Sequence, residues 1–222
     1  MPIDNKEKMQ SNPFSTGGGG VNFETRVQAV FVVLLLTGQV APCIPSWPIN
    51  RIKLQGRYEG FNTDDFVLYA KDENTESEAK LLAQIKHSIA ITEGNETFGE
   101  VMQAAWNDFN NNSLFDINKD SIALITGPLS ASDIENVRTI MEWARYSLDE
   151  VEFINKINTS RFSSETKRNK LKVFRTHLNK ANKDVEVSDK QLWEFLRKFY
   201  ILGYDLDVES GVTFSLLNSL IA

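Results

Sequence analysis

The chain has 222 residues, of which 41% are hydrophobic and 24% charged, and its formal net charge is −6. This composition is typical of a folded protein and excludes a disordered one, and the length fits one domain with or without a helical appendage. The net negative charge argues against a protein that coats nucleic acid by bulk electrostatics, but it is compatible with a local basic groove. The single cysteine, Cys43, excludes an intramolecular disulfide framework and a multi-cysteine zinc site, and it favours a reducing, cytoplasmic compartment.

The first 20 residues are polar and end in four glycines, which predicts a flexible arm over residues 1–20. The arm has no positively charged start that leads into an apolar core, so it is not a secretory signal. A phosphate-binding loop is disfavoured, because no strand precedes the glycines and no Lys-Ser/Thr pair follows them. From Val27 to Leu36 the chain is mostly apolar over ten residues. This run is too short to span a membrane and predicts a buried helix over residues 21–38.

Three strands are predicted next, at Arg51–Leu54, Phe66–Ala70 and Leu81–Ile85, with turns at Gly56–Gly60 and Lys71–Glu78. Gln84 and Lys86 lie two positions apart, so on a strand they point to the same face. Pairing of the second and third strands would bring one of the adjacent acids Asp64 and Asp65 together with Gln84 and Lys86 at one edge of a sheet.

The rest of the core is predicted as a helix, a strand and a second helix. Thr97–Phe109 has an apolar stripe of Phe98, Val101, Met102, Ala105 and Phe109. Ser121–Thr126 has the pattern of a buried strand. Ser132 or Asp133 then begins a helix that carries Ile134, Val137, Ile140, Met141 and Ala144. The pattern predicts a mixed α/β core that ends near Tyr146.

Beyond this core the chain reads as helical. Helices are predicted at Glu150–Ile157, Glu165–Asn182, Ser188–Leu202 and Thr213–Ile221. Ser188 and Gln191 have the spacing of a capping box. From Arg161 to Lys183 there are eight Lys or Arg residues and one acid, Glu165. We weigh two interpretations of this basic segment equally, a solvated helix face and a phosphate-binding patch.

An acid, an amide oxygen and an ammonium that converge on one sheet edge favour a site for a hard cation beside a phosphate. Each part has an ordinary explanation alone, because paired aspartates are common in turns and alternating polar residues are common on half-exposed strands. Lys86, however, follows a run of apolar residues that predicts a central strand, where a lysine needs an explanation. Mg²⁺ prefers oxygen ligands, often carboxylates together with a substrate phosphate.

These residues resemble a known family. Glu24, Asp65 and Gln84-x-Lys86 are similar to the PD-(D/E)xK nuclease motif, with Gln84 in place of the second acid. The segments GGGGVNFE, TDDFVLY and QIKHS, with the tail SDKQLWEFLRKF and its YDL segment, resemble more narrowly the double-strand DNA endonuclease domain at the N-terminus of bacterial antiphage effectors. These effectors include CBASS effectors and antiviral STAND ATPases. The similarity spans roughly residues 17–220.

The resemblance implies a restriction-endonuclease-like mixed sheet flanked by helices over residues 21–148. A helical subdomain over 149–222 would lead into a C-terminal sensor or ATPase region. It implies Glu24, Asp65 and Gln84 as ligands of Mg²⁺, or of Mn²⁺ in its place, with Lys86 catalytic. The implied activity is metal-dependent endonuclease cleavage of double-stranded DNA in antiviral defence, by a cytoplasmic protein that forms a homo-oligomer when activated and has no membrane partner.

Several alternatives stay open. Asp65 lacks the family's preceding proline, so Asp64 is an alternative ligand. Without the resemblance, Glu24 is better explained as an acid in the first turn of its helix, where it complements the helix dipole. His87 is interpreted as a packed or hydrogen-bonded histidine rather than a ligand. The main functional alternative is a catalytically silent nuclease-like module for DNA binding or oligomerisation, and a further one is an RNase on the same fold.

Overall fold

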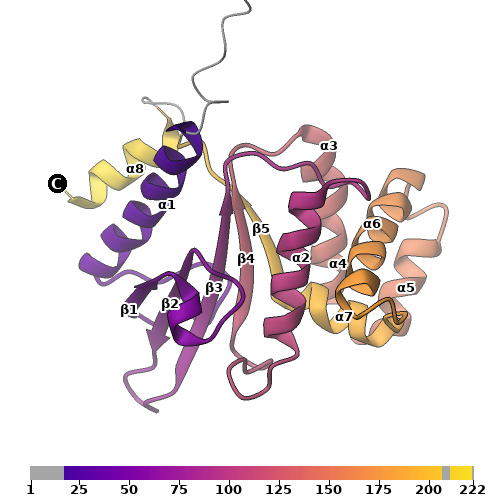
Figure 1. Cartoon of the computed structure of the whole chain (residues 1–222), viewed down its shortest axis with the longest axis horizontal. Coiled ribbons are helices and arrows are strands. Elements are labelled where there is room, and N and C mark those ends of the chain that lie inside the picture. The colour runs from indigo at the N-terminus through magenta and orange to yellow at the C-terminus, as the bar shows by residue number, and fades with distance from the viewer. Residues whose placement is uncertain (1–17, 207–210, 222) are drawn as a thin grey trace, which may run out of the picture.

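The computed structural model describes residues 18–206 and 211–221, and these residues form a mixed α/β structure around one five-stranded sheet (Figure 1). The sheet has the strand order β1-β2-β3-β4-β5. The strands are β1 (Ile49–Leu54), β2 (Phe66–Lys71), β3 (Glu78–Lys86), β4 (Ser121–Thr126) and β5 (Phe199–Gly203). The predicted mixed α/β class with helices flanking a mixed sheet is therefore confirmed.

Helices cover both faces of the sheet. They are α1 (Gly18–Leu36), α2 (Glu96–Phe109), α3 (Ala131–Asp133), α4 (Thr139–Tyr146), α5 (Glu150–Asn158), α6 (Glu165–Ala181), α7 (Asp189–Lys198) and α8 (Val212–Ile221), with a 3₁₀ turn η2 (Gly56–Glu59) and a π-helical turn η3 (Ile134–Arg138). Within the part of the chain that the structure describes, no helix is long and apolar enough to cross a membrane.

Helix α1 begins earlier than the sequence predicts. Of the predicted arm over residues 1–20, positions 1–17 lie outside the described residues, while Gly18 to Gly20 belong to α1. Glu24 therefore lies in the second turn of the helix rather than the first, where the helix dipole acts most strongly. A dipole-complementing role consequently explains Glu24 less well than the sequence suggests.

The strand pairing places the candidate site. Strands β1, β2 and β3 form an antiparallel meander, whereas β3 with β4 and β4 with β5 pair in parallel. In the β2–β3 hairpin Phe66 pairs with Ala83, so the next position along each strand holds Asp65 and Gln84. The predicted hairpin is confirmed, and it brings these two polar residues to its open end.

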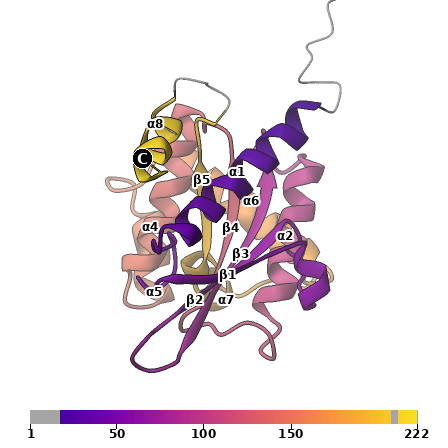
Figure 2. The same ribbon diagram turned by 90° about the vertical axis from the view of Figure 1, so that its left-hand side faces the viewer.

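Two apolar clusters lie on opposite faces of the sheet, because alternate residues of a strand point to opposite sides. The larger cluster joins Leu82 and Leu124 of the sheet to α2, η3 and α4–α7. The smaller cluster joins Phe66 and Ile125 to α1, and the partly buried Phe214 and Leu217 of α8 pack against it. Figures 1 and 2 show this division, with α1 and α8 together on one side. All members of the predicted α2 stripe are buried.

The predicted helix Ser188–Leu202 is wrong in its last part. The capping box at its start is present, with Ser188 and Gln191 bonded to each other's backbone. The helix ends at Lys198, however, and Phe199 takes extended backbone angles (φ −97°, ψ 132°). Phe199–Gly203 then forms β5 beside β4. The apolar residues that continue the helical stripe thus belong to a strand of the sheet. Sequence periodicity alone does not distinguish a strand from a helix in so short an apolar run.

The start of the helix after β4 also differs from the prediction. The capping residue is Ser130, whose hydroxyl accepts a hydrogen bond from Asp133 N, rather than Ser132 or Asp133. Ile134 begins the π-helical turn that follows and is 44% exposed. The larger apolar cluster includes residues on both sides of position 148, after which the helical subdomain is predicted to begin. Strand β5, which lies in that predicted subdomain, is the fifth strand of the sheet.

Candidate functional site

The carboxylate of Asp65 is the centre of the candidate site. Its Oδ2 atom accepts a hydrogen bond from Gln84 Nε2 at 2.7 Å and a second, short one from the backbone N–H of Ile85. Both donors belong to β3, so the bonds close the open end of the β2–β3 hairpin. The structure therefore brings together Asp65 and Gln84, as the sequence predicts.

The neighbouring acid Asp64 has a different role. Its Oδ2 forms an ion pair with Arg57 Nε at 2.8 Å, and its Oδ1 accepts from the backbone N–H of Arg57 at 3.1 Å. Its own backbone N–H donates to Gln84 Oε1 at 3.4 Å. The Asp64 carboxylate is thus directed to η2 while the Asp65 carboxylate is directed to β3. This geometry favours Asp65 over Asp64 as the acid of the site.

Electrostatics connect Glu24 and Lys86 to the same carboxylate. Burial raises the pKa of Asp65 above its ordinary value, and the negative charge of Glu24 raises this pKa further. The hydrogen bond from Ile85, the positive charge of Lys86 and the hydrogen bond from Gln84 act in the opposite direction. Glu24, Gln84 and Lys86 therefore each affect the Asp65 carboxylate, although α1 and β3 are far apart in the sequence. Glu24 also accepts a hydrogen bond from Gln28 Nε2 at 3.1 Å.

A buried carboxylate that the sequence analysis missed supports the loop before β2. Asp108 of α2 is 1% exposed, and it accepts hydrogen bonds from the backbone and side-chain amides of Asn62, both at 2.8 Å, and from the backbone N–H of Thr63 at 2.7 Å. These bonds fix the segment that leads into Asp64 and Asp65. The sequence does contain a signal, because Asp108 stands seven residues after Val101 and three after Ala105, on the buried face of its helix.

His87 packs against α1. Its ring meets the ring of Phe23 edge to face, with centroids 5.3 Å apart and an interplanar angle of 77°. Phe23 is fully buried and precedes Glu24 in the chain. The ring contact agrees with the interpretation of His87 as a packed or hydrogen-bonded histidine, and it helps to hold the part of α1 that carries Glu24 against the end of β3.

The side chains of Glu24, Asp65 and Gln84 are of the types that bind a hard cation, but the Gln84 amide is not oriented as a ligand. Glu24 and Asp65 supply carboxylate oxygens and Gln84 an amide oxygen, the ligands that Mg²⁺ accepts. The Gln84 amide, however, turns its nitrogen to Asp65 and its oxygen to Asp64 N. Among the described residues no group of three or more His, Cys, Asp or Glu side chains could hold a metal ion. The site has two acids, Glu24 and Asp65. A nuclease motif with an acid in place of Gln84 would have three.

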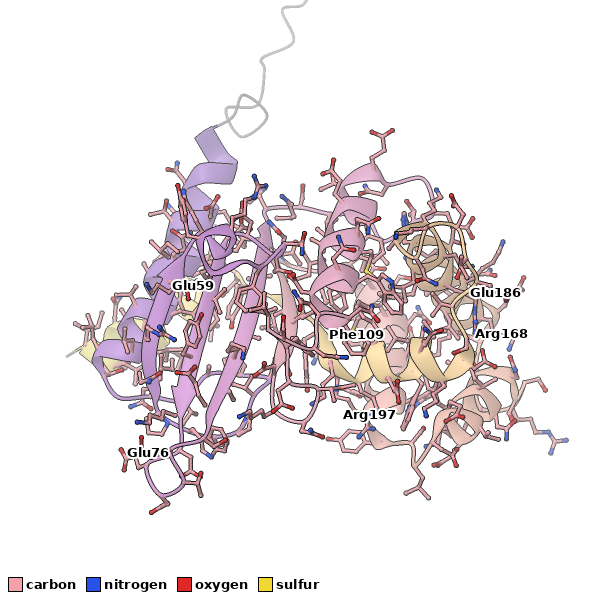
Figure 3. The ribbon with its side chains drawn as sticks, turned by 60° about the horizontal axis from the view of Figure 1, so that its bottom comes forward. Glu59, Glu76, Phe109, Arg168, Glu186 and Arg197 are labelled. Carbon is pink, nitrogen blue, oxygen red and sulfur yellow. The ribbon has the colours of Figure 1, made fainter. Side chains whose placement is uncertain are left out.

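Half of the cations of the basic segment are paired with acids among the described residues. Four of its eight cations form ion pairs, namely Lys167 with Glu135, Lys170 with Asp133, Lys172 with Glu93 and Arg175 with Asp189. In Figure 3 Arg168 lies at the helical end of the molecule, across the view from Glu59 and Glu76 near the hairpins. This arrangement favours a solvated, ion-paired helix face over a phosphate-binding patch for much of the segment.

No protein-family model, no curated protein and no solved structure matches this chain with statistical significance.

Proposed function

We propose that this protein is a metal-dependent endonuclease that hydrolyses phosphodiester bonds of double-stranded DNA. The observation that carries the proposal is the Asp65 carboxylate at the start of β2, which is bonded to Gln84 of β3 and feels the charges of Glu24 from α1 and Lys86 from the end of β3. The element order α1-β1-β2-β3-α2-β4 supports a restriction-endonuclease-like interpretation of the fold, because it carries the motif residues at the expected places of that architecture.

The residues of the site have distinct parts in the proposed chemistry. Asp65 and Glu24, with the amide oxygen of Gln84, would hold Mg²⁺ or Mn²⁺. Such an ion, when bound, polarises a phosphate and lowers the pKa of a water molecule. The ammonium of Lys86 would stabilise the negative charge that develops on the phosphate. Because Gln84 is neutral, the site attracts a cation less strongly than one with a third acid, and the phosphate of bound DNA would supply the missing negative charge.

The biological setting in the proposal is bacterial antiphage defence. It rests on the resemblance of the segments around Glu24, Asp65 and Lys86 to effector nucleases. A nuclease in its own cell must be held inactive, so we propose that the cleaving form is assembled from several copies, as part of a longer polypeptide with a sensor or ATPase region.

Plasmid cleavage tests the proposed activity. Supercoiled plasmid is incubated with the protein and Mg²⁺ or Mn²⁺, with and without EDTA, and with the variants Lys86→Ala and Lys71→Ala. Lys71 is the matched control, because it is a partly exposed lysine at the far end of the neighbouring strand β2. Lys86→Ala is expected to lower the cleavage rate by at least about a hundredfold, while Lys71→Ala retains it and both variants unfold at the wild-type temperature.

A second candidate, a catalytically silent nuclease-like module that binds DNA, is favoured by one observation. The Gln84 amide donates to Asp65, which gives the carboxylate a hydrogen-bond partner without a cation. In that case DNA binding persists in EDTA and no metal supports cleavage, even after the protein is oligomerised artificially. Structured RNA run beside the plasmid distinguishes an RNase. Full activity of Lys86→Ala at matched purity would contradict the proposed site.

A further inference from the structure

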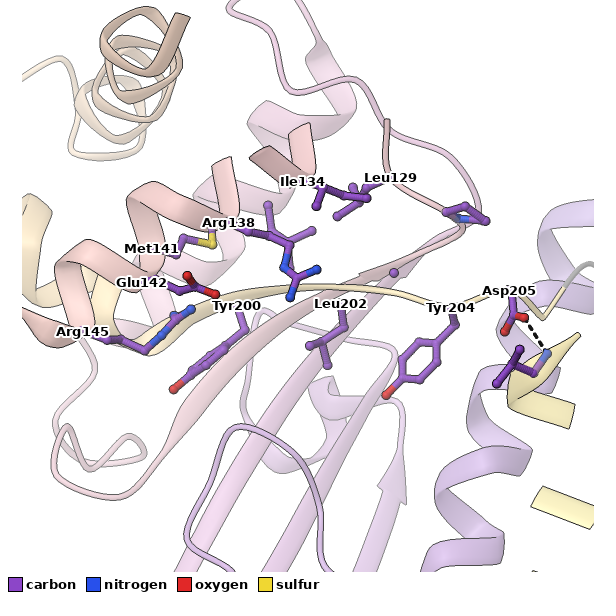
Figure 4. Close-up of a pocket in the computed structure, with 14 residues that line it drawn as sticks. Leu129, Ile134, Arg138, Met141, Glu142, Arg145, Tyr200, Leu202, Tyr204 and Asp205 are labelled. Carbon is purple, nitrogen blue, oxygen red and sulfur yellow. Dashed lines mark hydrogen bonds between the residues drawn. The ribbon is translucent and has the colours of Figure 1, made fainter. Parts of the chain in front are cut away.

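A cavity of about 540 Å³ lies between strand β5 and the helical segment that runs from η3 into α4 (Figure 4). Val212, at the start of α8, also lines it. Its volume falls within the range of small-molecule sites, roughly 300 to 1,000 Å³. The described residues that line it include none of Glu24, Asp65, Gln84 and Lys86. The cavity is therefore large enough for a small organic ligand and is separate from the proposed nuclease site.

Arg145, in the last turn of α4, contributes a partly buried guanidinium to the cavity wall. Its Cζ lies 4.2 Å from the centroid of the Tyr200 ring, and its Nη1 donates to Phe199 O at 3.4 Å. No acid among the described residues forms an ion pair with it. A guanidinium has five N–H donors, and they lie in its own plane, so stacking on an aromatic ring leaves most of them available to a ligand.

Arg138, the last residue of η3, is a second cation on the same wall. It precedes Arg145 by seven positions, a spacing that places both on one side of the helical segment. Its side chain is exposed and forms neither an ion pair nor a hydrogen bond with any described residue. In Figure 4 this side chain is directed toward β5, above Leu202. Two guanidiniums therefore line one wall, and no described acid is bonded to either.

Two acids also line the cavity, but neither neutralises the arginines. Glu142 stands four positions after Arg138 and three before Arg145, a spacing at which helical ion pairs form, yet it forms none with either. Asp205 lies at the other end of β5, where its Oδ2 accepts a hydrogen bond from the backbone N–H of Val212 at 2.8 Å. On the helical wall the two arginines outnumber the one glutamate, so this wall attracts an anion.

The remainder of the lining is largely apolar or aromatic. It includes Leu129, Ile134, Met141, Tyr200, Leu202 and Tyr204. Small-molecule sites commonly combine such a lining with a few polar groups that fix the orientation of the ligand. A ligand with one anionic group and an apolar or aromatic body would use both parts of this cavity.

We propose that the cavity binds a small organic phosphate, with its phosphate group held by Arg138 and Arg145 and its body against Ile134, Met141 and Leu202. A guanidinium matches the geometry of a phosphate in a bidentate contact. The two arginines are about 10 Å apart along the helix axis, and their long side chains can converge on one group. A phosphate monoester carries nearly two negative charges at neutral pH, which suits two cations better than the single charge of a carboxylate does. The inference goes beyond the proposed nuclease activity and does not depend on it.

Calorimetric titration of the full chain in EDTA tests the proposal with three probes: AMP, adenosine and inorganic phosphate. EDTA keeps divalent cations out of the candidate nuclease site, so the outcome is independent of the proposed cleavage. AMP is expected to bind at least about tenfold more tightly than either of the other probes, because it alone has both the phosphate and the aromatic body. AMP that binds no more tightly than adenosine or inorganic phosphate, or that shows no saturable binding at millimolar concentration, would overturn the proposal.

Variants of the cavity wall separate its two parts. Arg138→Ala is expected to weaken AMP binding by about tenfold or more, at an unchanged unfolding temperature, since the side chain makes no contact that stabilises the fold. Arg161→Ala, at an exposed arginine outside the cavity, should leave binding unchanged. Glu142→Gln removes a negative charge from the wall and should strengthen the binding of AMP. Ile134→Ser should weaken the binding of AMP but not that of inorganic phosphate. Wild-type affinity for AMP in Arg138→Ala would overturn the proposal.

Modification of arginines by phenylglyoxal gives a second readout that locates the ligand. Saturating AMP should slow the modification of Arg138 and Arg145 and leave that of Arg161 unchanged, as measured by mass spectrometry of the peptides. A general stabilisation of the fold would not distinguish Arg138 from Arg161, because both are exposed. If AMP protected neither Arg138 nor Arg145, the proposed placement of the phosphate would be wrong.

Discussion

The side-chain amide of Gln84 donates a hydrogen bond to the carboxylate of Asp65 at 2.7 Å, across the open end of the β2–β3 hairpin. The donor is an amide where the second acid of a PD-(D/E)xK motif would stand. An amide can bond to a carboxylate directly, whereas two carboxylates so close need a cation or a shared proton between them. The presence of Gln84 in place of an acid therefore determines how the candidate site is stabilised when no cation is bound.

Gln84→Glu should make the stability of the protein depend on Mg²⁺. Without the ion, two ionised carboxylates face each other, and the free energy of unfolding should fall by about 1–3 kcal/mol. With millimolar Mg²⁺ the loss should be largely restored, and the affinity for the ion should exceed that of the wild type. Thermal unfolding with and without Mg²⁺, and calorimetric titration, measure the two effects. Gln39→Glu, at an exposed glutamine after α1, is the control. Equal stability of Gln84→Glu with and without Mg²⁺ would contradict a cation site there.

The raised pKa of Asp65 gives a pH dependence with a defined sign. Between the ordinary aspartate pKa and the raised value, the folded chain binds a proton at Asp65 that the unfolded chain has lost. The contribution of Asp65 to the free energy of unfolding therefore falls as the pH rises through this window. Asp65→Asn does not ionise, so its stability relative to the wild type should increase over the same window. Urea unfolding from about pH 3 to pH 7 measures this difference. Asp64→Asn is the control, and an Asp65→Asn difference that does not change with pH would argue against a buried, repelled carboxylate.

Glu24→Gln should lower the pKa of Asp65. The negative charge of Glu24 raises that pKa in the wild type, and the variant removes the charge while keeping the size of the side chain. Titration of the Asp65 carboxyl carbon by NMR reports the change directly. Glu100→Gln, on α2, offers a control acid that does not contribute to the pKa of Asp65. An unchanged Asp65 pKa in Glu24→Gln would place Glu24 too far away to share a cation with Asp65.

Asp108→Ala should destabilise the fold and the site together. The substitution leaves the amides of Asn62 and Thr63 without their acceptor at a buried position, at a cost of about 3 kcal/mol in the free energy of unfolding. Asp108→Asn, which keeps one acceptor oxygen, should lose less. Urea unfolding measures the stability, and hydrogen exchange of the Asn62 and Thr63 amides tests the cause. Unchanged exchange at both amides would contradict the proposed support of this loop.

The β2–β3 hairpin and helix α2 could be predicted because the sequence pattern within each segment determines its secondary structure. The period of two in Gln84-Ile85-Lys86 and the stripe from Phe98 to Phe109 each specify one face. Strand β5 could not be predicted in the same way, since Phe199–Gly203 continues an apolar helical stripe and becomes a strand only by pairing with β4. Asp108 was missed for a related reason. The sequence places it on the buried face of α2, but its partners, the amides of Asn62 and Thr63, are set by the fold.

The change from antiparallel to parallel pairing at β3 has a consequence for the order in which the sheet assembles. The β1-β2-β3 meander is closed by two local connections, residues 55–65 and 72–77, so its strands can meet at a small cost in chain entropy. Strand β5 joins β4 only after a long crossover through α3 to α7 has been placed, and such distant contacts form slowly. The half of the sheet that carries Asp65 and Gln84 is therefore expected to form early in folding, and β5 to join last.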